Sequence, residues 1–146
     1  MLTTRRLDIA DARCVLEGAG RRAEEIGVPM CTAVVDHAGV LVAFERLDGG
    51  KVSSVDIAID KAYTAAAARK ETAFYGDDTE PNSPAWRIHG TNGGRFSTIG
   101  GGVPVIVDGE VVGGIGVSSG TATQDVDVAE AALAHFHAHQ GAGARR

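Results

Sequence analysis

Two basic residues and one histidine could carry chemistry in this chain, whose formal net charge is -5. Lys61 lies among apolar neighbours in an alanine-rich segment, and Arg46 ends a run of strand-forming residues. Either cation could anchor a carboxylate or a phenolate. His89 could shuttle protons, because the ordinary pKa of an imidazole is about 6.5. We therefore take Lys61, His89 and Arg46 as candidate catalytic residues.

Two environments are open to Lys61. In a pocket, desolvation would lower the pKa of its amine and leave it useful for catalysis or for holding an acidic ligand. On a helix surface, its ammonium would instead reach solvent along its apolar stem, which is how lysines usually behave beside apolar surface.

Further polar residues fall at strand ends, at a helix start and in a long connection, where ligand sites commonly collect. These candidate ligand-binding residues are Asp48, Trp86, Arg95, Ser118, Ser119 and Asp125. The segment 118–125 leads into a helical pattern, and the unpaired N–H groups of a helix start can receive an anion or a polar ligand. Asp125 already places negative charge there, so we expect a polar or hydroxylated ligand, or a subunit partner, rather than a phosphate.

The histidines near the end of the chain suggest a metal site at first sight. His135 and His139 share a helix face, whereas His137 points away, and no carboxylate completes a zinc-protease pattern. Cys14 and Cys31 fit no spaced metal motif, and we expect both to be small buried hydrophobes. We therefore predict no metal site; His135 and His139 would be the candidates if one existed.

Nucleotide motifs are absent from the sequence. The segment GGKVS at 49–53 is no phosphate loop, because Glu45 stands where a glycine is required and Val52 replaces the Ser or Thr. No G-x-S-x-G elbow occurs, and no G-x-G-x-x-G follows a strand. We expect neither a nucleotide cofactor nor a serine hydrolase.

Apolar periodicity predicts the elements that must position these residues. The predicted helices are 9–26, 55–70 and 123–139. The predicted strands are 30–36, 39–47, a short one at 95–98, and the two runs 103–107 and 111–117. Strand 39–47 is apolar on both faces at first, so we expect it to lie inside the sheet.

The last two runs flank Asp108-Gly109, a strong hairpin signal, and Gly113, Gly114 and Gly116 would let another backbone, helix or ligand approach closely. The connection 71–97 carries turn residues and the only Trp. Connections of this length are usually functional, so we expect a lid or a subunit contact there.

Length and charge exclude several classes of protein. At 146 residues the chain is long enough for one domain, with a frayed tail from about residue 141. The acidic balance argues against nucleic-acid binding. Neither a secretory signal nor an apolar run of membrane-spanning length occurs, so we expect a cytoplasmic protein without membrane contact.

Three segments together resemble the GlcG/HbpS family, the haem-degrading or DUF336 domain, which also forms the C-terminal part of PduO-type cobalamin adenosyltransferases. They are VVDHAGVLVAFERLDG, SSVDIAIDKAYTAAAARK and GGGVPVIVDGEVVGGIGVSSGTATQDVDVAEAAL. The resemblance implies a profilin-like α+β fold, an antiparallel sheet of about five strands with flanking helices in the order α-β-β-α-β-β-β-α. It places recurring family positions at Asp36, Arg46, Asp48, Lys61, Gly114, Gly116, Ser118 and Asp125.

The resemblance also implies a small-molecule ligand and a homo-oligomer, a dimer, tetramer or octamer. Haem or another tetrapyrrole is the first ligand to consider, although the sequence does not require it. Haem-binding relatives use a histidine in the first helix, which this chain lacks. An axial ligand would come from His37, His89, the C-terminal histidines, or an oxygen donor such as Thr121.

Two further functions stay open beside haem binding. The first is a small-substrate enzyme, a lyase, isomerase or hydrolase of an aromatic-catabolic or secondary-metabolite pathway, with a Lys/Arg/His pocket. The second is a non-catalytic structural or sensory oligomer.

Overall fold

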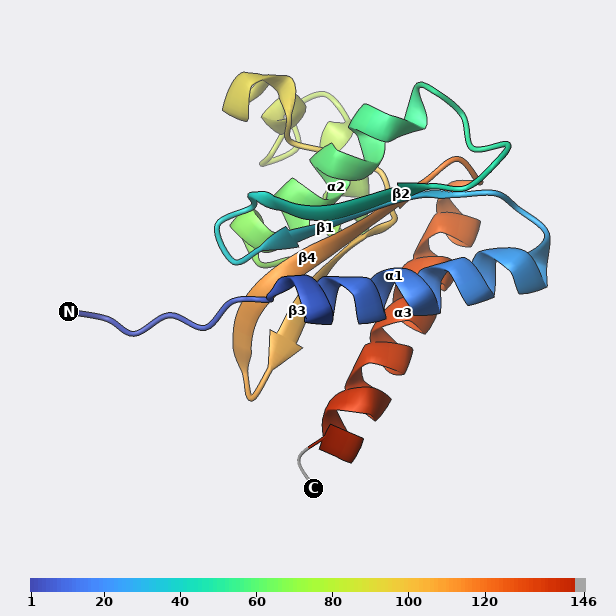
Figure 1. Cartoon of the computed structure of the whole chain (residues 1–146). Coiled ribbons are helices and arrows are strands. Elements are labelled where there is room, and N and C mark those ends of the chain that lie inside the picture. The colour runs from blue at the N-terminus through green and yellow to red at the C-terminus, as the bar shows by residue number, and fades with distance from the viewer. Residues whose placement is uncertain (144–146) are drawn as a thin grey trace.

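The computed structural model describes residues 1–143, and the side chains of all of these except 77–79 and 142–143. Its centre is an antiparallel sheet with the strand order β2-β1-β4-β3. Helices α1 and α3 cover one face of this sheet and α2 covers the other (Figure 1). The α+β class with an open antiparallel sheet is thereby confirmed.

The elements have the following bounds. The helices are α1 (Ile9–Ile26), α2 (Ser54–Ala68) and α3 (Ala122–Gly143). The strands are β1 (Cys31–Asp36), β2 (Leu41–Arg46), β3 (Gly102–Val107) and β4 (Glu110–Ser118). Three 3-10 helices connect α2 to β3: η1 (Thr72–Thr79), η2 (Ile88–Gly90) and η3 (Asn92–Gly94).

The sheet has four strands in the described residues, rather than about five, because the predicted strand at 95–98 does not form. Its backbone bonds to a side chain of α2 instead of a neighbouring strand. The Thr64 hydroxyl accepts the Ser97 N–H at 2.9 Å, and its one hydrogen is shared between the Asp60 carbonyl at 2.8 Å and the Arg95 carbonyl at 3.1 Å. One buried threonine thus takes the backbone groups that a ladder would use.

Strand β2 lies at an edge of the sheet, so its predicted interior position is wrong. It pairs with β1 alone, and its residues are exposed or half-buried throughout. Val42 and Phe44 pack on opposite faces against the margins of the two hydrophobic clusters, which explains why both faces of the strand are apolar.

The predicted helix ends differ in accuracy. Helix α1 begins at a capping box of Asp8 and Asp11 and ends at Gly27 with φ 69°, as its sequence predicts. Helix α2 ends at Ala68 rather than residue 70, and Arg69 adopts a left-handed φ of 56°. Helix α3 continues through Gly143 where fraying was expected; the rest of the predicted tail, 144–146, lies outside the described residues.

The predicted hairpin joins β3 to β4, with positive φ at both Asp108 (51°) and Gly109 (79°), the pattern of a type I′ turn. The glycines of β4 let α2 lie directly on the sheet. A Cβ at Gly114 would stand 2.6 Å from the Ala62 carbonyl oxygen, and one at Gly116 would collide with the Ala58 carbonyl. The expected close approach is therefore made by a helix.

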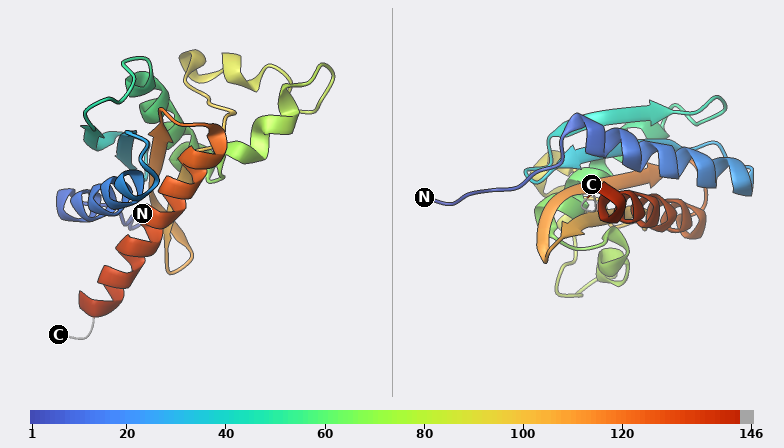
Figure 2. Two further views of the ribbon diagram at one scale, coloured as in Figure 1. Left: turned by 90° about the vertical axis from the view of Figure 1, so that its right-hand side faces the viewer. Right: turned by 60° about the horizontal axis from the view of Figure 1, so that its bottom comes forward.

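The connection between α2 and β3 stands away from the sheet beside α2 (Figure 2). Trp86 is 46% exposed and Phe74 is 60% exposed in this connection. Within the described residues, no helix combines the length and the apolarity that a membrane crossing requires.

Candidate functional site

Lys61 and Asp125 form a buried ion pair that joins α2 to α3 at the end of β4. The Lys61 Nζ lies 2.9 Å from Asp125 Oδ2 and donates to the Val117 carbonyl, also at 2.9 Å. The two side chains are 1% and 4% exposed. Lys61 therefore neither reaches solvent along its stem nor stands as a lone amine in a pocket.

The second carboxylate oxygen of Asp125 accepts the Gly120 N–H at 3.0 Å. Gly101 closes the space beside the pair, since a Cβ there would stand 2.8 Å from Asp125 Cβ and 3.0 Å from Lys61 Nζ. Because the ammonium offsets the carboxylate, Asp125 does not add net negative charge to the start of α3. The expectation that its charge disfavours an anion there loses its basis.

Ser118 and Ser119 connect the end of β4 to the loops around it. The Ser118 hydroxyl donates to the Ser54 hydroxyl at 3.1 Å, and the Ser119 hydroxyl accepts the Lys51 N–H at 3.0 Å. Both serines are buried. The structure thus gathers Lys61, Ser118, Ser119 and Asp125 at one corner, where their polar atoms hold the chain together.

The remaining predicted residues do not join this corner. Arg46 and Asp48 are exposed at the end of β2. His89 and Trp86 are exposed on the long connection. Arg95 lies over the Tyr63 ring at 3.8 Å and 3.7 Å from Asp60, so it holds the connection against α2. Burial raises the pKa of the Asp60 carboxyl, and Arg95 partly opposes that rise.

An apolar cleft of about 500 Å³ opens beside the buried pair, between η1, the segment before β3 and the start of α3. It is lined by Ala73, Gly76, Thr98, Ile99, Gly100, Ala122, Thr123 and Val126. Its volume falls in the range of small-molecule sites. These lining residues were not predicted from the sequence. The only signal in the sequence is the run of glycines before β3: a Cβ at Gly100 would stand 3.0 Å from Val126 Cγ2, so a glycine lets this segment pass close to α3.

The start of α3 is capped where it meets this cleft. Thr121 and Gln124 bond reciprocally: the Thr121 hydroxyl accepts the Gln124 N–H at 3.2 Å, and the Gln124 side chain accepts the Thr121 N–H at 2.9 Å. Ala122 and Thr123 follow the cap, and the first N–H groups of a helix have no partner within it. The backbone N–H groups of Ala122 and Thr123 thus form a polar margin to an otherwise apolar cleft.

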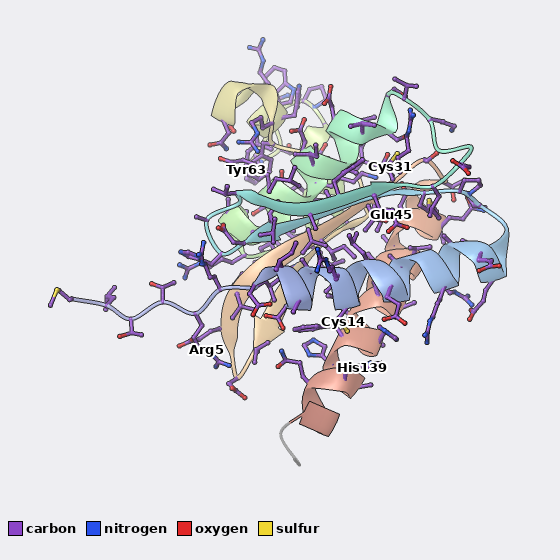
Figure 3. All side chains as sticks on the ribbon, in the orientation of Figure 1. Arg5, Cys14, Cys31, Glu45, Tyr63 and His139 are labelled. Atoms are coloured by element: carbon purple, nitrogen blue, oxygen red, sulfur yellow. The ribbon has the colours of Figure 1, made fainter. Side chains whose placement is uncertain are left out.

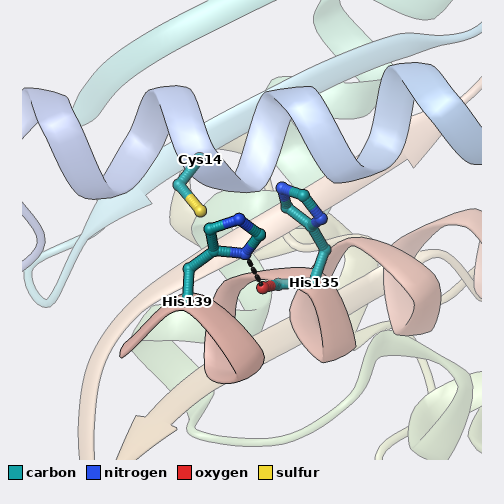
Figure 4. A group of neighbouring side chains, drawn as sticks. All are labelled: Cys14, His135 and His139. Atoms are coloured by element: carbon teal, nitrogen blue, oxygen red, sulfur yellow. Dashed lines mark hydrogen bonds between the residues drawn. The ribbon is translucent and has the colours of Figure 1, made fainter. Parts of the chain in front are cut away.

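A second cluster lies between α1 and α3, where Cys14 faces His135 and His139. One possible ligand atom from each residue lies within 4.8 Å of the other two. Figure 3 shows Cys14 and His139 between the two helices, and Figure 4 shows the thiol and both imidazoles side by side. Burial, with Glu17 and Asp11 adding to it, raises the pKa of the Cys14 thiol.

Cys14 is half-buried at this cluster rather than enclosed as an apolar residue, whereas Cys31 is fully buried as expected. The i,i+4 spacing of the two histidines was visible in the sequence. The third member was not, because only the packing of α1 on α3 brings Cys14 to them.

Haem fits the apolar cleft in part. The walls offer the apolar surface that a porphyrin face requires, but among its lining residues only Thr98 and Thr123 carry hydroxyls, and none is His, Cys or Met. The other candidate donors are not among the lining residues: His37 lies in the turn after β1, His89 on η2, and the C-terminal histidines in the second half of α3. The Thr121 hydroxyl is engaged in the α3 cap.

Comparison with known proteins agrees with this architecture. The sequence model of the family described as haem degrading protein HbpS-like matches residues 7–134. A 15.0 kDa protein from the dhaT-dhaS intergenic region of Citrobacter freundii is 39% identical, over 89% of this chain and 92% of that protein. The corrinoid adenosyltransferase PduO of Salmonella typhimurium is 30% identical over 88% of this chain, which spans only 38% of PduO.

Solved structures give the same relationship. The Klebsiella pneumoniae protein ORFY, assigned to DUF336, superposes with a TM-score of 0.92 and 33% identity, covering 94% of this chain and 95% of ORFY. A PduOC structure in complex with haem superposes with a TM-score of 0.85 and 30% identity, over 89% of this chain and 94% of PduOC. The predicted resemblance is confirmed: this chain belongs to the HbpS-like, haem-degrading protein family.

Proposed function

We propose that this protein binds haem in the apolar cleft at the start of α3. The observation that carries the proposal is the cleft itself, about 500 Å³ with apolar walls. Support comes from the relative PduOC, 30% identical, whose structure was solved with haem.

The cleft has the two surfaces that a porphyrin carboxylic acid needs. Ala73, Ile99 and Val126 supply apolar contact for the ring. The first N–H groups of α3, at Ala122 and Thr123, can donate to a propionate. Lys61 offsets the charge of Asp125 behind this margin, so the carboxylate meets no uncompensated negative charge there.

Iron bound in this cleft would supply redox chemistry, and the cleft's own oxygen donors are Thr98 and Thr123. A hydroxyl is a weaker ligand than an imidazole, so we expect loosely held, exchangeable haem rather than a permanently bound group. That is consistent with a carrier or a degradation partner.

Titration of the haem-free protein with hemin tests the proposal. We expect a saturable Soret shift with one haem per chain. Ala73→Trp should weaken binding at least tenfold, because it fills the cleft from an exposed wall position. Ala67→Trp, on an exposed position of α2 away from the cleft, is the matched control. Equal binding by both variants would contradict the site, and an unsaturable shift would contradict haem binding altogether.

We also propose that the protein self-associates through the edge strand β2. Among the described residues no strand pairs with its outer edge, and Val40 and Leu41 are 62% and 46% exposed beside it. An unpaired edge with apolar side chains is a natural template for pairing with a second copy. Light scattering on wild type and on Leu41→Lys tests this, and a monomeric wild-type protein would contradict it.

A further inference from the structure

We propose that Cys14, His135 and His139 form a binding site for a divalent transition metal of the zinc class. The site joins α1 to α3 on the opposite face of the sheet from α2. It shares no residue with the lining of the proposed haem cleft, so metal binding and haem binding can be tested separately.

The ligand types and their spacing suit zinc. One thiolate and two imidazoles are ligands that Zn²⁺ prefers, whereas Mg²⁺ and Ca²⁺ require oxygen donors. In tetrahedral zinc sites the bonds are about 2.0–2.3 Å, so the ligand atoms must approach to roughly 3.3–3.7 Å of one another. They already lie within 4.8 Å, and His139 is an exposed side chain that can move inward.

The hydrogen bonding of His139 prepares it as a ligand. Its Nδ1 lies 2.8 Å from the carbonyl oxygen of His135 (Figure 4). A carbonyl only accepts, so Nδ1 is the donor of this bond, and Nε2 is the ring nitrogen left to bind a metal. A histidine that donates one ring nitrogen to a carbonyl while the other binds metal is the usual arrangement in metal sites.

His135 has an unsatisfied polar atom at the same place. Its Nε2 is buried without a hydrogen-bond partner; the Glu17 carboxylate stands 3.6 Å away, within ion-pair distance of a protonated ring but too far for a hydrogen bond. Leaving such an atom unpaired is unfavourable, and a bound metal or its water would supply the missing partner. Gly18 allows this burial, since a Cβ there would stand 2.6 Å from His135 Cβ.

The site leaves room for a fourth ligand. A cleft of about 360 Å³ adjoins it, lined by Ala10, Asp11, Cys14, Phe136, His139 and Gln140. Three protein ligands with an open position allow water or a small anion to complete a tetrahedron. The Asp11 and Glu17 carboxylates beside the cluster also favour a cation over a neutral ligand.

Cobalt substitution tests this site directly in the tag-free, haem-free full chain. Co²⁺ titration should give a thiolate-to-metal charge-transfer band and the visible bands of tetrahedral coordination, and Zn²⁺ should displace them. Cys14→Ser should abolish the charge-transfer band, and His139→Gln should weaken Zn²⁺ binding more than about tenfold.

His137→Gln is the matched control, since His137 lies on the same helix, is exposed and stands outside the cluster. Its titration should match wild type. Equal loss in His137→Gln and His139→Gln would indicate non-specific binding to the helix and overturn the proposal. A cobalt spectrum without a thiolate band would overturn the role of Cys14.

Thiol protection provides a second readout that does not depend on cobalt. Zn²⁺ should slow alkylation of Cys14, while Cys31, fully buried at another place, serves as the internal reference. The Ala73→Trp variant should show the same protection, because its substitution fills only the haem cleft. Unchanged alkylation of Cys14 in saturating Zn²⁺ would contradict the site.

Discussion

The Lys61–Asp125 pair and the Cys14–His135–His139 cluster both lie between helices, and their hydrogen bonding differs. At the Lys61–Asp125 pair, both carboxylate oxygens and two ammonium donors are in use, and the pair is almost inaccessible. At the Cys14–His135–His139 cluster, a buried ring nitrogen has no hydrogen-bond partner and a cleft lies alongside.

This difference in hydrogen bonding distinguishes a polar group that stabilises the fold from one that binds a ligand. Buried polar atoms in folded proteins normally find partners, so a pair in which the nitrogen and both oxygens are hydrogen-bonded indicates a group that holds the fold. Lys61, one of the candidate catalytic residues, belongs to this first kind. An incomplete set of hydrogen bonds indicates a missing partner, and the thiol and imidazoles identify that partner as a metal.

The largest expected effect comes from breaking the pair. Lys61→Met leaves Asp125 buried without its counter-ion and should cost about 3–5 kcal/mol of unfolding free energy. Urea denaturation measures the loss. The double variant Lys61→Met/Asp125→Leu should recover much of it, because no uncompensated charge then remains. A single variant as stable as wild type would show that the pair is not structural.

Binding of Zn²⁺ to the Cys14–His135–His139 cluster should have the next largest effect, and it should raise the free energy of unfolding rather than lower it. Zn²⁺ at one hundred times its dissociation constant should stabilise the protein by about 2.7 kcal/mol, provided that only the folded state binds it. Thermal unfolding with and without Zn²⁺ measures this. Cys14→Ser should lose most of the gain and His137→Gln none; an equal gain in all three proteins would remove the distinction between the clusters.

Gly18→Ala tests the packing that sets the cluster. The added methyl would collide with His135 Cβ and stand 3.0 Å from Ala132 Cα. We expect a net loss of about 1–2 kcal/mol, since overpacking outweighs the better helix propensity of alanine. Zn²⁺ affinity should fall together with stability, and Gly20→Ala, whose nearest contact is 3.7 Å away, is the control.

Cys14→Ser in metal-free protein should have the smallest effect, within about 0.5 kcal/mol of wild type, because Cys14 is half-buried and outside the enclosed core. Chemical denaturation in the presence of a chelator measures it. A loss comparable to that of Lys61→Met would mean that the thiol is a structural group, and the comparison between the clusters would fail.

Much of the fold could be predicted because its signals are local. The α1 cap, the β3–β4 turn and the alanine-rich pattern of α2 each lie within a few residues. The edge position of β2 could not, because apolar residues on both faces are also typical of an inner strand. Nor could the loss of the strand at 95–98, which depends on Thr64 of another element.

The candidate sites were harder to predict because they depend on contacts between distant segments. The sequence contains Lys61 and Asp125 but not their distance of 2.9 Å, which places a candidate catalytic residue in a buried ion pair. The spacing of His135 and His139 was readable, whereas Cys14 required the α1–α3 packing. The cleft at α3 is lined by residues without chemical signatures of their own.

The strand order has a consequence for how the chain folds during synthesis. The central pair of the sheet joins β1 to β4, with Cys31 opposite Ser118, and α1 packs on α3. A nascent chain that has not yet released Ser118 from the ribosome holds β1 with only β2 beside it, and α1 without its helical partner. We expect such chains to remain sensitive to protease until β4 emerges, so that folding waits for the last third of the sequence.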